Sequence, residues 1–178
     1  DLYRRRDPRG GRAVTETVLA LVPSYGLLLV ALGTFFSCLA LPVPSSLIML
    51  SAGGFAAAGD LVLWQVGATA LIGAIAGDQM GYLIGRYAAQ HLRGRGLSAR
   101  RAALMARAEA KLHQNAAMAV FFSRWLVSPL GPYVNFAGGA ARIDWRGFTR
   151  AGAAGEVVWV TLYVGLGAAF ADDIVALA

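Results

Sequence analysis

Three charged residues stand alone inside long apolar stretches of the sequence, and their types could do chemistry there. They are Asp78, Arg124 and Glu156. A charged side chain inside a membrane-spanning segment costs about 2.5–3.5 kcal/mol on insertion scales, so it usually faces a partner or a wet cavity. A guanidinium group matches the geometry of phosphate, and buried carboxylates often relay protons. We therefore predict that Arg124 binds phosphate and that Asp78 and Glu156 form a proton or charge relay.

Each of these residues also has a simpler explanation. Arg124 lies eight residues after its apolar segment begins, so its side chain could instead extend to the membrane surface. Asp78 could hydrogen-bond a neighbouring helix or pair with Arg124. It lies beside a series of glycines at every fourth position, a spacing that favours close helix packing: Gly73, Gly77, Gly81 and Gly85.

The composition indicates an integral membrane protein. Of the 178 residues, 57% are hydrophobic and 15% are charged, whereas a soluble domain has roughly 25% charged residues. The net charge of +6 does not indicate nucleic-acid binding, because the basic residues flank the apolar segments. A single cysteine, Cys38, excludes an intrachain disulfide. We expect no metal or other cofactor, and because the sequence starts with Asp1 we expect it to be a fragment.

Charge placement predicts how the first half crosses the membrane. Residues 1–16 and the amphipathic loop at about 90–115 are rich in arginine, which places both in the cytoplasm. An even number of crossings must lie between them, and residues 17–33 and 61–85 supply two. Residues 34–59 must then enter and leave on one side, as a re-entrant hairpin.

The second half follows the same rule. Arginines between 142 and 150 also indicate the cytoplasm, so residues 116–141 should form a second re-entrant hairpin that opens from the opposite face. Residues 151–170 then cross once. The predicted fold is an all-α inverted repeat of two opposed hairpins, with about three spanning helices and amphipathic surface helices, in a single membrane domain at 17–178.

An internal repeat supports this arrangement. Pro44 precedes Ala52-Gly53-Gly54 by eight residues, and Pro129 precedes Ala137-Gly138-Gly139 by the same distance. Proline removes a backbone donor and breaks a helix. Short segments interrupted by Gly and Pro at matching positions of two halves are the best sequence indication of a transporter-type site near the membrane midplane.

These segments resemble the DedA family of bacterial inner-membrane proteins, also called SNARE-associated or VTT-domain proteins. The resemblance covers about residues 30 to 170. It depends on the proline turn at 35–46, the Gly-Asp-Gln-Met-Gly-Tyr-Leu-Ile-Gly-Arg block at 77–86, and Phe122-Ser123-Arg124-Trp125 followed by Ala137-Gly138-Gly139.

The resemblance implies proton-coupled transport or scrambling of a lipid, with undecaprenyl phosphate or a phospholipid as cargo. Ser37 and Ser46 stand where such proteins usually have acids, and Leu130 stands in place of a second arginine, while Arg124 matches the first. Serine does not titrate, so a relay through the first hairpin would not work in the same way. The predicted substrate-binding residues are Arg124, Ser37, Ser46, Pro44 and Pro129.

Two alternatives to transport follow from the same residues. An intramembrane hydrolase would need a nucleophile with an intramembrane histidine, but both histidines lie in polar sequence, so we do not expect an enzyme. The lost charges favour a divergent relative that acts in membrane organisation or envelope maintenance without transport. In either case we expect a multi-pass protein of the bacterial inner membrane with a cytoplasmic N-terminus. Its expected partners are membrane lipids, with a homo-oligomer as an alternative to the monomer.

Overall fold

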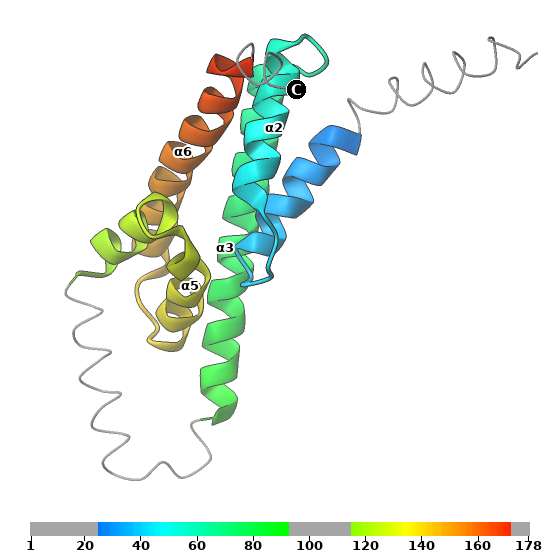
Figure 1. Cartoon of the computed structure of the whole chain (residues 1–178). Coiled ribbons are helices and arrows are strands. Elements are labelled where there is room, and N and C mark those ends of the chain that lie inside the picture. Colours follow the sequence, from blue (N-terminus) through cyan, green and yellow to red (C-terminus); the bar gives the residue numbers. More distant parts are fainter. Residues whose placement is uncertain (1–24, 93–114, 172–178) are drawn as a thin grey trace, which may run out of the picture.

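The computed structural model describes residues 25–92 and 115–171, and within these ranges all regular structure is helical (Figure 1). The predicted all-α class is therefore confirmed. The basic segment 1–16 and nearly all of the predicted amphipathic loop at 90–115 lie outside the described residues. The helices are Tyr25–Ser37, α2 (Ser45–Ala57), α3 (Leu63–Leu92), residues 115–125, the short 3-10 helix η1 (Ser128–Leu130), α5 (Gly131–Ala140) and α6 (Trp145–Ala169).

The first helix differs from the predicted boundary between residues 33 and 34. Helix Tyr25–Ser37 continues through that point, and the chain breaks only at 38–44. Nothing at the predicted boundary stops a helix, whereas two prolines lie in the observed break. Gly33 instead makes room for α2, because a Cβ atom there would lie 2.8 Å from Ile48 Cδ1.

The two long helices extend beyond their predicted limits. Helix α3 reaches Leu92 rather than residue 85, and α6 begins at Trp145 rather than residue 151. Asp144 caps α6, since its carboxylate accepts a hydrogen bond from the backbone N–H of Gly147 at 2.7 Å. This interaction satisfies one of the free amides at a helix start. Of the polar residues after 141, Arg146 and Arg150 thus lie in the first turns of α6, whereas Arg142 and the capping Asp144 precede it.

The second hairpin segment was predicted more closely. Residues 115–125 form one arm and α5 forms the other, so the segment runs from 115 to 140. Each end lies within one residue of the predicted limits of 116–141. Between them the chain turns at 126–127 and passes through η1, with proline in the first turn of both η1 and α5. A proline at these positions lacks only an N–H that the helix does not need.

Helix α5 packs against α3 through reciprocal glycine contacts. A Cβ atom at Gly139 would clash with the carbonyl oxygen of Tyr82, and one at Gly85 would clash with the carbonyl oxygen of Phe136. The two backbones approach so closely that neither position has space for a side chain. Residues 73 and 77 of α3 play the same role against helix Tyr25–Ser37. The predicted glycine face of α3 is therefore a packing surface.

Helix α2 packs against α6 with the same pattern. A Cβ atom at Gly53 would meet the carbonyl oxygen of Val164, and one at Gly167 would meet that of Leu50. In both pairs the contacting residues are three positions apart on each helix. The glycine used is the first of Gly53-Gly54 but the second of Gly138-Gly139, so the sequence repeat and the packing repeat differ by one residue.

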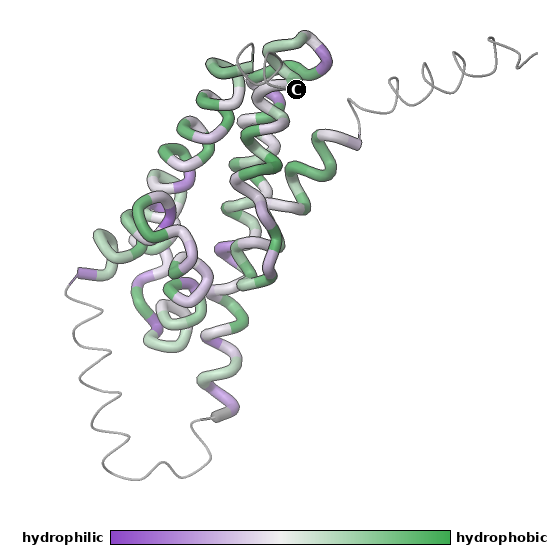
Figure 2. The backbone as a smooth tube through the Cα atoms, viewed as in Figure 1, coloured by the Kyte–Doolittle hydropathy of each residue, from purple (hydrophilic) through white to green (hydrophobic). Residues whose placement is uncertain are grey.

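The outside of the helices is strongly apolar. Helix α6, with 25 residues, is the only described helix long and apolar enough to cross a membrane by length and composition, while Tyr25–Ser37 and α2 are shorter apolar helices. Large hydrophobic side chains are exposed along several helices, among them Trp64, Ile72 and Leu47, at 65–71% exposure. Figure 2 shows hydrophobic residues recurring along the length of the helices. The charged residues Asp78, Arg124 and Glu156 are buried, while many large hydrophobic side chains are exposed. This distribution is the opposite of that in a soluble helical bundle.

Candidate functional site

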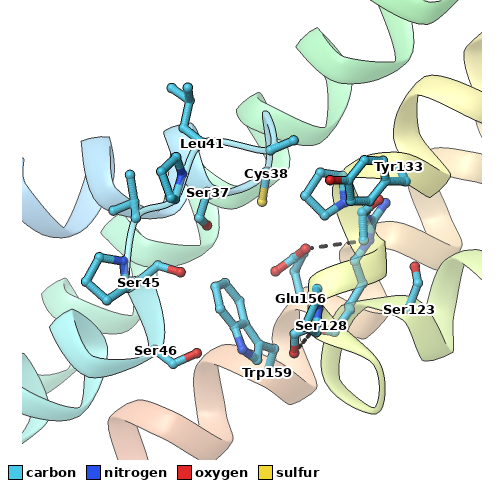
Figure 3. A pocket seen from close by; sticks show the side chains of 18 of the residues that line it. Ser37, Cys38, Leu41, Ser45, Ser46, Ser123, Ser128, Tyr133, Glu156 and Trp159 are labelled. Carbon is cyan, nitrogen blue, oxygen red and sulfur yellow. Dashed lines mark hydrogen bonds and ion pairs between the residues drawn. The ribbon is translucent and has the colours of Figure 1, made fainter.

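The turns of the two hairpin segments meet at a cavity of about 370 Å³, a size in the range of small-ligand sites. The residues at 37–47 line one side, and residues between 123 and 133 line another. Helix α6 closes the wall with Glu156 and Trp159 (Figure 3). Hydroxyl groups are frequent in the lining, which contains Ser37, Ser45, Ser46, Ser123, Ser128 and Tyr133.

Arg124 is the centre of the buried polar network beside this cavity. Its side chain is only 2% exposed and forms ion pairs with Asp78 (Nη1 to Oδ1, 3.2 Å) and Glu156 (Nε to Oε1, 3.5 Å). It also donates hydrogen bonds to the Asn135 side-chain oxygen at 2.6 Å and to the Gly131 carbonyl oxygen at 3.3 Å. The guanidinium is therefore held inside the protein and does not extend to its outer surface.

Small residues on α6 make room for this side chain. A Cβ atom at Gly155 would lie 2.7 Å from Arg124 Cγ, and one at Gly152 would lie 3.4 Å from its Nη2. The Arg124 guanidinium carbon also lies 5.7 Å from the centre of the Phe148 ring, within the range of a cation–π interaction. The arginine is thus held by contacts on several sides.

Asn135 joins the two hairpin segments through this network. Its amide nitrogen donates to Asp78 Oδ1 at 2.8 Å and to the backbone carbonyl oxygen of Cys38 at 3.2 Å. Its oxygen accepts the Arg124 hydrogen bond. The residue is fully buried on α5, opposite Gly81 of α3, where a Cβ atom would lie 2.9 Å from Asn135 Cβ. One amide therefore connects α3, the first turn and the second hairpin.

Several buried polar atoms in the same region have no hydrogen-bond partner. They include Arg124 Nε, Glu156 Oε2 and the indole nitrogen of Trp159. Buried polar groups are normally satisfied, and an unsatisfied one costs about 1–3 kcal/mol. Arg124, Glu156 and Trp159 all line the cavity. Residues with unsatisfied polar atoms therefore gather around this cavity.

The structure gathers the residues singled out from the sequence. Arg124, Ser37, Ser46, Pro44 and Pro129 all line the one cavity, together with Glu156. Asp78 is not part of the cavity lining, but it forms an ion pair with Arg124, which does line the cavity. The Ser37 hydroxyl donates to the Thr34 carbonyl oxygen at 3.0 Å, which is the backbone-satisfying role considered for it.

Sequence reasoning missed Asn135, Trp159 and Tyr133. An uncharged amide inside the apolar run 116–141 was a signal for Asn135, since it would need partners in a membrane. Nothing in the sequence distinguished Trp159 and Tyr133 from other aromatic residues. Their position depends on how α6 and α5 meet at the cavity.

One grouping of possible metal ligands lies in the described residues. The ligand atoms of Cys38, Asp78 and Glu156 lie within 4.8 Å of one another. Arg124 forms ion pairs with both carboxylates, so these acids already have a positively charged partner. We assign no metal to this group.

Comparison with known proteins identifies the family. The profile of the VTT domain matches residues 41–169, well over half of the chain. The chain belongs to the VTT-domain family, also known as DedA. The match includes both proline turns, Asp78, Arg124, Asn135 and Glu156.

Two relatives of this VTT-domain protein are named as membrane proteins. One is the uncharacterized membrane protein slr0232 of Synechocystis sp., 32% identical over 158 residues, covering 85% of this chain and 70% of the relative. The other is the inner membrane protein YabI of Escherichia coli, 26% identical over 155 residues, covering 85% of this chain but only 61% of the relative. No solved structure matches the chain.

Proposed function

We propose that this VTT-domain protein moves a phosphate-bearing lipid, either undecaprenyl phosphate or a phospholipid, across the bacterial inner membrane as a transporter or scramblase. The observation that supports this proposal most directly is a buried arginine, Arg124, at the wall of a cavity formed by two broken helical segments. Discontinuous helices that meet around a polar site are typical of transporters. The naming of the E. coli relative as an inner membrane protein supports this location.

The hairpins are proposed to be re-entrant and to enter from opposite faces. Helix Tyr25–Ser37 packs on the N-terminal half of α3 through Gly73 and Gly77, while α5 packs on its C-terminal half through Gly81 and Gly85. Figure 1 shows α2 and α5 beside opposite halves of α3. With a cytoplasmic N-terminus, the repeated glycine contacts then relate two inverted halves. The cavity between the hairpin turns would lie near the middle of the membrane.

In this proposal Arg124 binds the lipid phosphate by exchanging one of its partners. Its Nε contact with Glu156 is longer than its contact with Asp78, and Glu156, unlike Asp78, lines the cavity. A phosphate that enters the cavity can replace the Glu156 carboxylate on this side of the guanidinium. Asp78 and Asn135 hold the other side. Proton uptake by Asp78 or Glu156 would favour such an exchange, because it removes the competing negative charge.

Reconstitution of the full chain in liposomes tests this function. Translocation of an acyl-labelled phospholipid should be measured with and without a proton gradient, in the wild type and in Arg124→Gln. We expect the variant to lose translocation, and Arg146→Gln, an exposed arginine in α6, to retain it. Equal rates in wild type and Arg124→Gln would refute the role of Arg124.

A second candidate function is membrane organisation without transport. The observation that favours it is the network of ion pairs and hydrogen bonds around Arg124, which would also suit a purely structural role. The same liposome assay separates the two. Gradient-dependent movement supports a coupled transporter, gradient-free movement supports a scramblase, and no movement supports the structural role.

A further inference from the structure

The turns that follow α2 and α5 have the same backbone hydrogen bonds. In each turn one N–H donates to a carbonyl oxygen three residues earlier, and the next N–H donates to one five residues earlier, at 3.0–3.2 Å. This pattern ends a helix with one residue in the left-handed conformation, a position that glycine usually occupies. After α2 that residue is Gly59, at φ +90°, whereas after α5 it is Arg142, at φ +52°.

Arginine is an unfavourable choice for the backbone at this position. A left-handed conformation brings Cβ too close to a carbonyl oxygen, and glycine avoids this contact because it has no Cβ atom. Glycine would end α5 as well as it ends α2, so the turn itself does not require a side chain. A signal for membrane topology needs basic residues in the loop but not at this one position. The exposed side chain of Arg142 therefore points to a role of its own.

Arg86 of α3 lies beside the Arg142 turn. A Cβ atom at Gly139 would lie 2.8 Å from the backbone nitrogen of Arg86, and the same glycine accepts the backbone hydrogen bond from Arg142. The Tyr82 hydroxyl, one helical turn before Arg86, donates to the Ile143 carbonyl oxygen at 2.7 Å. The turn is thus fixed against α3, and the backbones of both arginines lie next to one glycine.

Positive charge in this region has little compensation from acids. The exposed arginines within 25–92 and 115–171 form no ion pair with any residue of these ranges, and they are Arg86, Arg142, Arg146 and Arg150. The neighbouring acid, Asp144, accepts the Gly147 N–H at the start of α6. The turn after α2 contains an acid, Asp60, and no arginine. Figure 1 shows the ends of α2 and α5 toward opposite ends of the molecule, so its two ends differ in charge.

Trp145 adds an aromatic ring to the same surface. Its indole N–H donates to the Gln79 side-chain oxygen at 2.6 Å, which holds the ring against α3 although Trp145 is 50% exposed. Gln79 lies seven residues before Arg86, on the same face of α3. Tryptophan is enriched where membrane proteins meet lipid headgroups. A fixed indole near two arginines without ion pairs suits a lipid with an anionic headgroup.

We propose that Arg86, Arg142 and Trp145 form a binding surface for the headgroup of an anionic phospholipid. The two guanidinium groups bind the phosphate, which they match in geometry and charge, and the indole ring lies beside the start of the acyl chains. None of the three residues lines the cavity. The bound lipid therefore belongs to the surrounding leaflet, and the surface does not depend on lipid transport by the protein.

Tryptophan fluorescence of the full chain in vesicles tests the proposal. Phosphatidylglycerol or phosphatidylcholine with brominated acyl chains serves as the quencher, and the Trp145 signal is the difference between wild type and Trp145→Phe. We expect phosphatidylglycerol to bind beside Trp145 roughly fivefold more strongly than phosphatidylcholine, the factor that about 1 kcal/mol for one arginine near an anionic membrane surface produces. Salt should weaken this preference, because exposed charges are screened.

Three variants separate the arginine side chains from the backbone of the turn. Arg142→Gly suits the left-handed position, so in phosphatidylcholine it should unfold at the same temperature as wild type or at a higher one. Its preference for phosphatidylglycerol should nevertheless fall at least twofold. Arg86→Gln should lower the preference similarly without altering the turn. Arg142→Lys retains the charge and should retain most of the preference.

Trp64 provides the matched control. It is an exposed tryptophan near the opposite end of α3, close in sequence to Asp60 and to no arginine, and its signal should show no preference for phosphatidylglycerol. Equal quenching of Trp145 by both lipids would overturn the proposal, as would an unchanged preference in both Arg142→Gly and Arg86→Gln. If neither lipid quenches Trp145, protein and not lipid covers this surface, and the proposal is also overturned.

Discussion

Asn135 donates a hydrogen bond to the Asp78 carboxylate at 2.8 Å, across the closely packed surface between α5 and α3. The same side chain accepts a hydrogen bond from Arg124 at 2.6 Å. An amide is suited to this position because it donates to an acid and accepts from a base at once. Asn135 therefore fixes the relative position of the ion pair and of the first turn.

Replacing Asn135 by leucine should destabilise the protein. The substitution removes a partner from Asp78, Arg124 and the Cys38 carbonyl oxygen, all of them buried. Each unsatisfied buried group costs about 1–3 kcal/mol. The free energy of unfolding, measured in detergent micelles, should fall by roughly that amount or more. Asn115→Leu, at an exposed position, is the control, and an equal loss in both variants would contradict the role of Asn135.

Arg124→Gln alone should lower the free energy of unfolding more than Arg124→Gln combined with Asp78→Asn. Arg124→Gln leaves two buried carboxylates without a cation, a change that costs about 3–5 kcal/mol in buried pairs. In the double variant with Asp78→Asn, one of those carboxylates is gone, so part of the loss should be recovered. A double-mutant cycle on the free energy of unfolding measures this coupling. Additive effects would show that the pair at 3.2 Å contributes little.

Much of this site could be predicted because its residues have chemical properties that are unfavourable in an apolar helix. A charged residue in an apolar segment must find partners, so Asp78, Arg124 and Glu156 could be identified before their contacts were known. The prolines marked the two turns for the same reason, since they cannot continue a helix. These charged residues and prolines could be identified without knowledge of the tertiary structure.

Other features depended on tertiary contacts and could not be predicted. The boundary placed after residue 33 was wrong because Gly33 serves helix packing and does not end the helix. The start of α6 was placed too late because Asp144 was grouped with a polar turn, although it caps the helix. Trp159 gained significance only through the position of α6 at the cavity.

Small substitutions in the α5–α3 contact should have large effects. Gly85→Ala and Gly139→Ala place a Cβ atom against backbone, where no side chain can move aside. Overpacking of this kind costs about 1–3 kcal/mol. Gly67→Ala, in the same helix α3 but with nothing within 4 Å of the added atom, should be neutral or slightly stabilising. Thermal unfolding of the three variants in detergent compares them, and equal melting temperatures would argue against the close approach.

Cys38 gives a direct probe of the cavity because it is the only cysteine in the sequence. It is 7% exposed, lines the cavity and accepts the Asn135 hydrogen bond through its backbone oxygen. A small methanethiosulfonate reagent should therefore modify it slowly, and a bulky maleimide more slowly still. A phosphate-bearing lipid in the micelle should slow the reaction further, because a headgroup bound at Arg124 would occupy the cavity that Cys38 lines.

The matched control for this measurement moves the thiol out of the cavity. A Cys38→Ser variant with Ala58→Cys carries its single thiol at an exposed position after α2. Its labelling rate should be high and should not depend on the lipid. If Cys38 reacts as fast as this exposed thiol, or if added lipid slows both thiols equally, the turn at 38–44 does not form the wall of a lipid-binding cavity.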